Sequence, residues 1–256
     1  MSVLAKLSGR SFLVLGRAGM DLYPDPPGEQ TETATHFYAA LGGSSANIAV
    51  ALVKQGCRAA LLTRVSDDAI GRYCVNQLDA YGVERSHVHV AGGEARTSLA
   101  LVETRLENCQ SVIYRNGAAD FTLTLADVEA VDYSPYSGLI VTGTALAAEP
   151  SRGATFRAMA LARAAGLPII FDIDYRPYSW PSPQIAGDVY SRAGALSDII
   201  VGNDVEFGFM AGDPERGLDK ARALVAQGAA IAVYKMGERG AVTITAEAEF
   251  ETGIYP

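Results

Sequence analysis

The segment LGGSSANIA carries the residues best suited to bind a polar ligand. Its adjacent glycines, Gly42 and Gly43, let the backbone approach a ligand closely because they have no side chain. Ser44 or Ser45 can cap a helix that begins here, which places Asn47 in the first helical turn. An amide both donates and accepts hydrogen bonds, so Asn47 suits a sugar hydroxyl. A capped helix start with no ligand explains the same pattern about as well.

A carboxylate follows the first apolar run of the chain. Asp21 ends the segment GRAGMD, directly after the run FLVL. We expect Asp21 in a loop at the end of a strand, where its carboxylate can accept hydrogen bonds from two neighbouring hydroxyl groups. The alternative for an isolated loop aspartate is an ordinary surface turn.

The sequence lacks the motifs of several common kinds of binding site. The sequence contains no GxxxxGK[ST], and no GxGxxG follows its first apolar run, so the phosphate cradles of P-loop NTPases and dinucleotide-binding proteins are excluded. The three cysteines and three histidines form no CxxC, no HExxH and no zinc-like cluster. An odd number of cysteines cannot all pair within the chain, which favours a reduced protein without zinc.

The composition is typical of a globular protein of the cytoplasm. Of the 256 residues, 49% are apolar and 20% are charged, which excludes collagen-like, disordered and disulfide-scaffold proteins. The formal net charge is −8 and no basic stripe occurs, so nucleic acid is not an expected partner. No apolar run approaches the roughly 18 residues of a membrane helix, and the first residues do not resemble a secretory signal. We expect a cytoplasmic chain that binds no membrane.

Short apolar runs alternate with stretches of helical spacing, which predicts βαβ units and an α/β fold with a mainly parallel sheet. The predicted strands are Phe12–Leu15, Ala60–Val65, Leu139–Thr142, Ile169–Asp172, Ile199–Val201 and Ala230–Lys235. The predicted helices are Ser45–Gln55, Asp67–Tyr81, Ser151–Ala165, Ile185–Leu196 and Leu218–Gln227. Gly56, Gly82 and Gly166 follow the first three helices as terminating glycines.

Two stretches, at about 23–41 and 88–115, interrupt this alternation. The first is rich in Pro and Thr and ends in the strand-like HFYAAL, and the second holds SLALVET and CQSVIYR with no helix between them. We expect a small antiparallel excursion that serves as a lid over the carboxyl edge of the sheet. Two surface hairpins with no role are the alternative. Because lid strands leave unpaired edges, we also expect a homodimer formed through 88–115.

Five motifs, in order along nearly the whole chain, together resemble the ribokinase (PfkB-type) family of carbohydrate kinases. They are Asp21 at a strand end, the glycine pair with Asn47, the run VSDDAIG from Val65, the pair Asn203-x-x-Glu206, and the segment KMGERG from Lys235 to Gly240. Each is weak alone, but five in family order at compatible spacing make chance similarity improbable.

The resemblance implies a Rossmann-type αβα sandwich with a small β lid, and transfer of the γ-phosphoryl group of ATP to a primary hydroxyl, with Mg²⁺. By motif, sugar hydroxyls would be held by Asp21, Gly43 and Asn47. Asn203 and Glu206 would order Mg²⁺ near the phosphates, with Glu206 acting through water, although local helix capping would explain the same pair. The nucleotide side would be lined by Lys235, Gly237 and Gly240.

Within the family, four stretches are similar to the branch that phosphorylates 5-dehydro-2-deoxy-D-gluconate in myo-inositol catabolism. They are GRAGMDLYPDPPG, ALGGSSANIAVAL, SVIYRNGAAD and FDIDYRPYSWPS. A chain of net charge −8 needs local cations to bind such a sugar acid. Arg115 and Arg176 are candidates, and the resemblance assigns similar arginines to the acid group; either could instead form an exposed ion pair. Tyr114 would lie beside the sugar unless strand alternation turns it away.

Other substrates and another class of protein remain open. A 2-keto-3-deoxygluconate kinase or a fructokinase would fit the same motifs. In a different class, a noncatalytic carbohydrate-binding or regulatory protein would keep the sugar side and lack the transfer machinery.

In the family, the KxGxxG turn is followed by a Gly-Ala-Gly-Asp segment, whose N–H groups form an anion hole and whose Asp is the catalytic base. No such segment occurs before Pro256, and neither GAAD at 117–120 nor Gly212-Asp213 stands at the matching position. The resemblance therefore implies that residues 1–256 form a single kinase domain, incomplete at its C-terminal end, with the catalytic Asp beyond Pro256.

Overall fold

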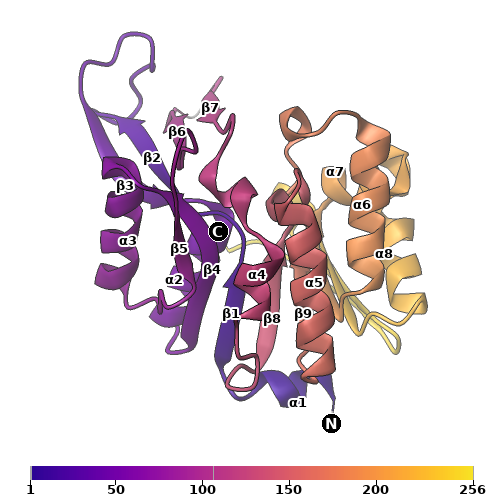
Figure 1. Cartoon of the computed structure of the whole chain (residues 1–256). Helices are drawn as coiled ribbons and strands as arrows, with labels where there is room; N and C mark the ends of the chain where they lie inside the picture. The colour runs from indigo at the N-terminus through magenta and orange to yellow at the C-terminus, as the bar shows by residue number, and fades with distance from the viewer. Residues whose placement is uncertain (1, 106, 256) are drawn as a thin grey trace.

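A nine-stranded sheet forms the centre of the structure, a computed structural model that describes residues 2–105 and 107–255 (Figure 1). In spatial order its strands are β13 (Glu249–Thr252), β12 (Ala241–Thr245), β11 (Ile231–Lys235), β10 (Ile199–Asn203), β9 (Ile169–Asp172), β8 (Gly138–Thr142), β1 (Ser11–Leu15), β4 (Arg58–Ser66) and β5 (Val88–Ala91). Neighbours from β11 to β5 pair in parallel, and β12 and β13 are antiparallel at one edge. The predicted mainly parallel sheet is confirmed.

Helices cover both faces of this sheet (Figure 1). One face packs against α2 (Ser44–Lys54) and α3 (Ala69–Tyr81). The other packs against α5 (Ser151–Ala164), α6 (Pro183–Ala195), α7 (Asp204–Ala211) and α8 (Gly217–Ala226). The shorter helices are α1 (Val3–Leu7), α4 (Leu125–Glu129), η1 (Ala119–Thr122), η2 (Gly143–Leu146), η3 (Pro177–Ser179), η4 (Pro214–Arg216) and η5 (Gly237–Arg239).

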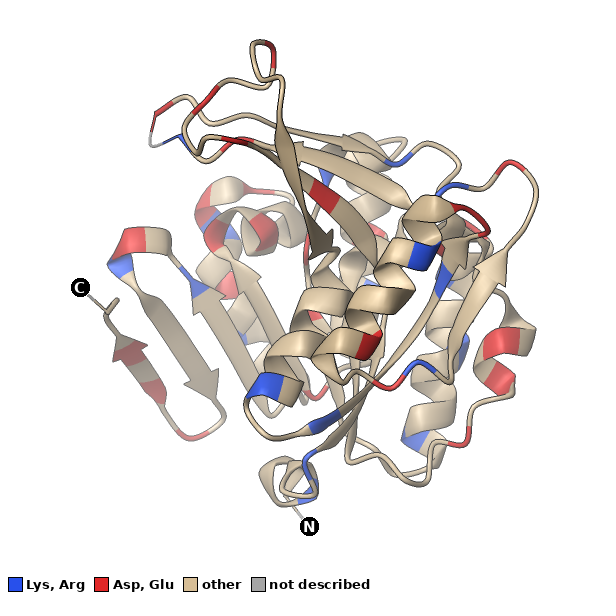
Figure 2. Cartoon of the chain, turned by 90° about the vertical axis from the view of Figure 1, so that its left-hand side faces the viewer, with Lys and Arg blue, Asp and Glu red and all other residues tan. Residues whose placement is uncertain are grey.

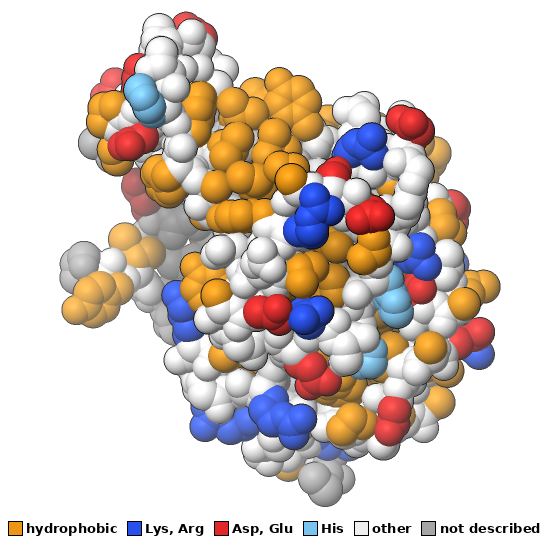
Figure 3. Space-filling view, turned by 60° about the vertical axis from the view of Figure 1, so that its left-hand side comes forward, with side chains coloured by type: hydrophobic (Ala, Val, Ile, Leu, Met, Phe, Trp, Pro, Cys, Tyr) orange, Lys and Arg blue, Asp and Glu red, His pale blue; other side chains and the backbone are white. Residues whose placement is uncertain are grey.

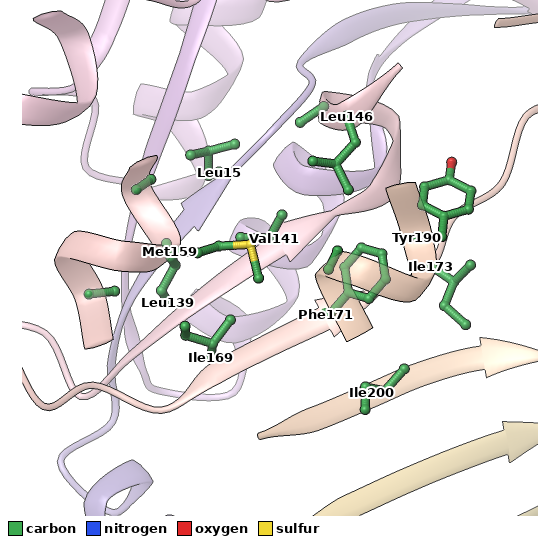
Figure 4. Packing of buried hydrophobic residues seen from close by; sticks show 14 of the residues in the cluster. Leu15, Leu139, Val141, Leu146, Met159, Ile169, Phe171, Ile173, Tyr190 and Ile200 are labelled. Carbon is green, nitrogen blue, oxygen red and sulfur yellow. The ribbon is translucent and has the colours of Figure 1, made fainter. Parts of the chain in front are cut away.

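The alternation of β1 shows why both faces need a cover. Phe12 and Val14 point into the core beside α2 and α3, whereas Leu13 and Leu15 point into the core on the other side. Figure 4 shows this second core, in which Met159 of α5 lies against strand residues such as Leu139. Strands that are apolar on both faces are typical of parallel sheets.

A second, four-stranded sheet stands above the large one (Figure 1). Its order is β3 (Phe37–Gly42), β2 (Gly19–Pro24), β6 (Ser98–Val102) and β7 (Ser111–Tyr114). It lies at the predicted excursion, with corrections, and its role as a lid stays a prediction. The sheet is mixed, because β2 and β6 pair in parallel. The lid also begins at Gly19 rather than near residue 23, and Val88–Ala91 pairs with β4 in the large sheet.

Charged residues of both signs are interspersed over the chain, without a basic stripe (Figure 2). Among the described residues, no helix is long and apolar enough to cross a membrane.

The predicted strands and helices all exist, with ends that differ by a few residues. Gly56, Gly82 and Gly166 have φ of 78°, 75° and 78°, so they end their helices in the left-handed conformation as predicted. One prediction about the start of α2 is wrong. Its N-cap is Gly43, with no side-chain cap, and Ser45 donates instead to the carbonyl of Leu15 at 3.2 Å.

Gly43 sets how closely the turn after β1 approaches α2. Its φ is 93°, and a Cβ at this position would overlap the carbonyl oxygen of Arg17 and lie 2.9 Å from the Cα of Ala18. The same contact lets the N–H of Ala46 donate to Arg17 O at 3.2 Å. Only glycine fits here, because both the backbone angle and the space exclude a side chain.

We expect Gly43→Ala to destabilise the protein by about 2–4 kcal/mol, from a left-handed backbone penalty plus overpacking. Gly28→Ala is the matched control, because Gly28 has the same φ of 93° but nothing within 4 Å of its Cβ position. It should cost only the backbone part, about 1 kcal/mol. Chemical denaturation of both variants measures the difference. Equal losses in the free energy of unfolding would show that the close contact of Gly43 with Arg17 and Ala18 does not contribute to the effect.

Candidate functional site

The carboxyl ends of neighbouring strands bring polar residues to one edge of the large sheet. Asp172 ends β9 and is paired in register with Thr142 at the end of β8. Asn203 ends β10 and is paired with Lys235 at the end of β11. Open α/β sheets bind ligands at this edge. The small sheet stands over the β1 side of the same edge (Figure 1).

Asp21 lies in the small sheet, not in a loop as predicted. It belongs to β2, and its cross-strand neighbours are Ala40 and Ala100, whose small side chains leave room around the carboxylate. Gly42 is also close, since a Cβ there would overlap the Asp21 carboxylate. Burial raises the pKa of Asp21, and the positive charge of Arg17 opposes this rise. The carboxylate therefore has the setting of a hydrogen-bond acceptor for hydroxyl groups.

The start of α2 adds hydroxyl and amide groups to this edge. Asn47 is exposed in the first turn of α2, as the sequence predicts. Behind it a chain of hydroxyls runs from Ser45 to Thr142 at 2.8 Å and from Thr142 to Thr144 at 3.1 Å. Ser44 joins this chain at 3.4 Å from Thr144. These contacts fix the helix start against the ends of β1 and β8.

Arg115 is buried and follows β7. It forms an ion pair with Asp120, donates from Nη2 to the Thr144 carbonyl at 3.1 Å, and lies 4.0 Å from the ring centre of Phe121. Its Nε and Nη1 atoms are buried with no hydrogen-bond partner among the described residues. The ion pair is buried rather than exposed, and Arg115 also lines a cavity of about 500 Å³ near Tyr178.

Arg176 and Tyr114 are placed less favourably for a ligand. The side chain of Arg176 is 41% exposed, and its Nη2 lies 2.9 Å from Asp174, so the ion-pair alternative describes it. Tyr114 is 59% exposed and pairs with Leu99, on the face of the small sheet opposite Asp21. Because strand side chains alternate, Tyr114 points away from the face that carries Asp21, and its place beside the sugar stays a prediction.

Asn203 and Glu206 form a capping box at the start of α7. Asn203 Oδ1 accepts from the Glu206 N–H at 2.8 Å, and Glu206 Oε2 accepts from the Asn203 N–H at 2.8 Å. Glu206 Oε1 also accepts from the N–H of Tyr175 at 3.0 Å. The capping alternative is therefore present in the structure, and it holds both carboxylate oxygens in fixed positions at the sheet edge.

The KMGERG segment forms the turn between β11 and β12. Lys235 is exposed at the end of β11, opposite Asn203. Gly237 has a φ of 58°, and Gly240 has a φ of 83° with its Cβ position overlapping the carbonyl of Thr252. The two glycines thus shape a tight turn next to the strand ends.

Four charged residues of this edge were not predicted as site residues. They are Arg17, Asp120, Asp172 and Asp174, of which three are buried and Asp172 is partly buried. Their common signal is position, because each follows or ends a predicted strand or the lid. Burial raises the pKa of Asp172 to about 6, and the nearby charge of Asp174 adds to the rise. A carboxylate so strongly shifted at a sheet edge is typical of a functional site.

The carboxylates of the described residues suit a magnesium ion that is bound mainly through the phosphates of a nucleotide. No three His, Cys, Asp or Glu side chains in the described part of the chain are grouped closely enough to hold a metal ion. Mg²⁺ usually keeps waters and binds through one or two carboxylates plus substrate phosphates. Asp172 and Glu206, which repel each other electrostatically, could supply those carboxylates. This donor set fits Mg²⁺ bound through water and phosphate.

A cavity of about 780 Å³ lies between α6 and α7, with Tyr234 and Arg239 in its wall. None of the predicted site residues lines it, so it does not belong to the site at the sheet edge.

The sequence of this chain is similar to a family of kinases and to named members of it. The model of the pfkB family of carbohydrate kinases matches residues 10–255. A protein named 5-dehydro-2-deoxygluconokinase from Photobacterium profundum is 36% identical over 95% of this chain and 75% of its own length. One of the same name from Geobacillus kaustophilus is 35% identical over 96% of this chain and 75% of its own length.

Solved structures show the same fold. A PfkB protein from a Polaromonas species superposes with a TM-score of 0.84 at 26% identity, over 96% of this chain and 83% of its own. A fructokinase double mutant from Vibrio cholerae, with fructose, ADP and potassium ion bound, gives a TM-score of 0.82 at 28% identity, over 96% and 78%. The predicted ribokinase-like fold is confirmed.

Asp172→Asn should stabilise the protein at neutral pH. Asp172 has a pKa of about 6 against an ordinary value of 3.8, so its ionised form is disfavoured in the folded state. This penalty develops between pH 4 and 6 and is complete above pH 6, where it amounts to about 3 kcal/mol at most. An amide carries no such penalty. We expect the variant to unfold at a higher temperature at pH 8, with the gain vanishing below pH 4.

Asp188→Asn, which removes an exposed carboxylate of α6, controls for the change in net charge. Thermal unfolding of both variants from pH 4 to 8 makes the comparison. A gain from Asp172→Asn that does not change with pH, or a loss, would contradict the assigned pKa.

Proposed function

Because this chain belongs to the PfkB family of carbohydrate kinases, we propose that it transfers the γ-phosphoryl group of ATP to a primary hydroxyl of a sugar acid, 5-dehydro-2-deoxy-D-gluconate. The name of the relatives at 34–36% identity supports this substrate. The structural observation that carries it is Arg115, a buried cation with free N–H groups on the lid side of the sheet edge. Family membership favours an enzyme over a noncatalytic binding protein.

The sugar would occupy the space between the small sheet and the start of α2. Asp21 would accept hydrogen bonds from its hydroxyls, and Asn47 and the Gly43 backbone would contact it from the helix side. Asp21 has small neighbours and a partly buried carboxylate, which suits the positioning of an attacking hydroxyl.

ATP would lie toward β10 and β11. Lys235, Gly237 and Gly240 would line its phosphate side, and Glu206 would hold Mg²⁺ through water. Bound Mg²⁺ would neutralise charge that develops on the phosphates. Asp120 is held by Arg115, so it is not a free base.

A neutral sugar is the second candidate substrate. It is favoured by the likeness to a fructokinase with fructose bound, at 28% identity. A 2-keto-3-deoxygluconate kinase would share the acid site and differ in the sugar. Rates of ATP consumption with a panel of the three sugars, using the protein expressed from its complete gene, separate these candidates. We expect the highest kcat/KM with 5-dehydro-2-deoxy-D-gluconate; a preference for fructose would contradict the proposal.

Asp21→Asn should lower kcat/KM by at least about tenfold, because the amide keeps the size but places a donor where hydroxyls need an acceptor. Stability should change little, since burial already disfavours the charge of Asp21. Asp25→Asn, an exposed position in the loop after β2, is the control and should keep normal rates. Near-normal turnover of the Asp21 variant with the sugar acid would contradict its role.

We also propose that two chains associate through the face of the small sheet that points away from Asp21. This face is apolar, and Figure 3 shows hydrophobic side chains gathered there. It presents Met20, Leu22, Phe37, Leu99, Leu101, Val112 and Tyr114. Val112 and Tyr114 are 47% and 59% exposed, and apolar patches of this kind mark association surfaces.

Val112→Glu should convert the dimer to a monomer, because it places a charge in the apolar face. Ser111→Glu is the matched control, since Ser111 is exposed on the same strand but points to the other face. Light scattering at micromolar concentration measures the mass of each. A monomeric wild type, or dimers in both variants, would contradict this interface.

A further inference from the structure

Arg17 is a buried cation that forms no ion pair with any other described residue. It follows β1 by two residues and is 6% exposed. Its Nη1 donates to the hydroxyl of Ser98 on β6 at 3.1 Å, whereas its buried Nε has no hydrogen-bond partner among the described residues. No carboxylate of the described residues lies within ion-pair distance of it. Burying an arginine in this way is costly, so the arrangement needs an explanation.

Two of the three carboxylates whose charges act on Arg17 are paired with other arginines. Asp120 is paired with Arg115, and Asp174 lies 2.9 Å from Arg176. The third, Asp21, is not within ion-pair distance of Arg17, so no carboxylate of the described residues neutralises Arg17 by direct contact. The Arg115 guanidinium also lies close enough to repel it. Two buried guanidinium groups therefore present unpartnered N–H donors to the same region beneath the small sheet.

The pKa of Arg17 is shifted in the direction expected for a buried cation. Burial lowers the pKa of Arg17, and the charge of Arg115 lowers it further. The carboxylates of Asp120, Asp174 and Asp21 oppose the change without cancelling it. The charged form of Arg17 is therefore disfavoured in the folded protein, and a bound anion would stabilise it.

We propose that Arg17 determines specificity for an acid sugar by binding its carboxylate, with Arg115 as the second cation; this rests on the proposed function. A guanidinium fork matches the two oxygens of a carboxylate, which a neutral hydroxyl cannot replace. Arg176 is the weaker candidate, because its side chain is 41% exposed and already paired.

The position of Arg17 points to the carboxylate of the sugar rather than to a phosphate of ATP. Asn203 and Lys235 stand on β10 and β11, which are three and four strands from β1. At about 4.8 Å per strand, these residues lie roughly 14–19 Å away along the edge. Asp21, which would bind the sugar hydroxyls, follows Arg17 by only four residues, and the positive charge of Arg17 lowers the pKa of Asp21.

Binding of two sugars to Arg17→Met by calorimetry tests the proposal without relying on catalysis. The probes are 5-dehydro-2-deoxy-D-gluconate and neutral D-fructose. Loss of a hydrogen-bonded charge should weaken binding of the acid roughly ten- to hundredfold and leave fructose binding within about threefold. Arg17→Lys, which keeps the charge but not the fork, should fall between. Arg85→Met, at an exposed arginine paired with Asp79, controls for the lost charge.

Thermal unfolding without ligand separates this role from a structural one. Because Arg17 forms no ion pair within residues 2–105 and 107–255, Arg17→Met should unfold no earlier than the wild type. A strongly destabilised variant, or equal losses for the acid and for fructose in both Arg17 variants, would overturn the proposal. Failure of the wild type to bind the acid would instead overturn the proposed function, and the two failures are distinguishable because only the second affects the wild type.

Discussion

The burial of two guanidinium groups beneath the small sheet is the constraint on which the site depends. Arg17 reaches this position because the turn after β1 packs against Gly43, where no side chain fits. Arg115 reaches it from the other side, held by Asp120 and by the Thr144 carbonyl. Nε of Arg17 and both Nε and Nη1 of Arg115 have no acceptor in the part of the chain that the structure describes. The fold therefore maintains positive charge at one end of the sheet edge, in a chain of net charge −8.

The opposite end of this edge has a different character. There Asn203 and Glu206 are fixed by a capping box, and Lys235 is exposed beside a glycine turn. Asp172 stands between the two ends with a pKa raised by burial. On the proposed function, the sugar acid would bind at the cationic end and the nucleotide at the opposite end, with a carboxylate between them. This order would suit phosphoryl transfer, because donor and acceptor must meet in line.

Much of the fold could be predicted from the sequence, because apolar periodicity and terminating glycines are local signals. The helix α7 was missed since it is short, contains Gly208 and is apolar on more than one side. Asp21 was assigned to a loop because nothing local shows that β2 continues into a second sheet. The sequence does not show which face of the small sheet Tyr114 occupies, because that depends on strand register. It also does not show that Arg176 pairs with Asp174, because that depends on how the loop folds. Arg17 was missed because burial of a charge is a property of packing, which spacing does not reveal.

A structure of the protein with 5-dehydro-2-deoxy-D-gluconate bound tests the central claim most directly. The account predicts a carboxylate oxygen of the sugar within hydrogen-bonding distance of Arg17 and Arg115, with its hydroxyls toward Asp21. A carboxylate that faces Arg176 or solvent, with Arg17 still bonded only to Ser98, would contradict it.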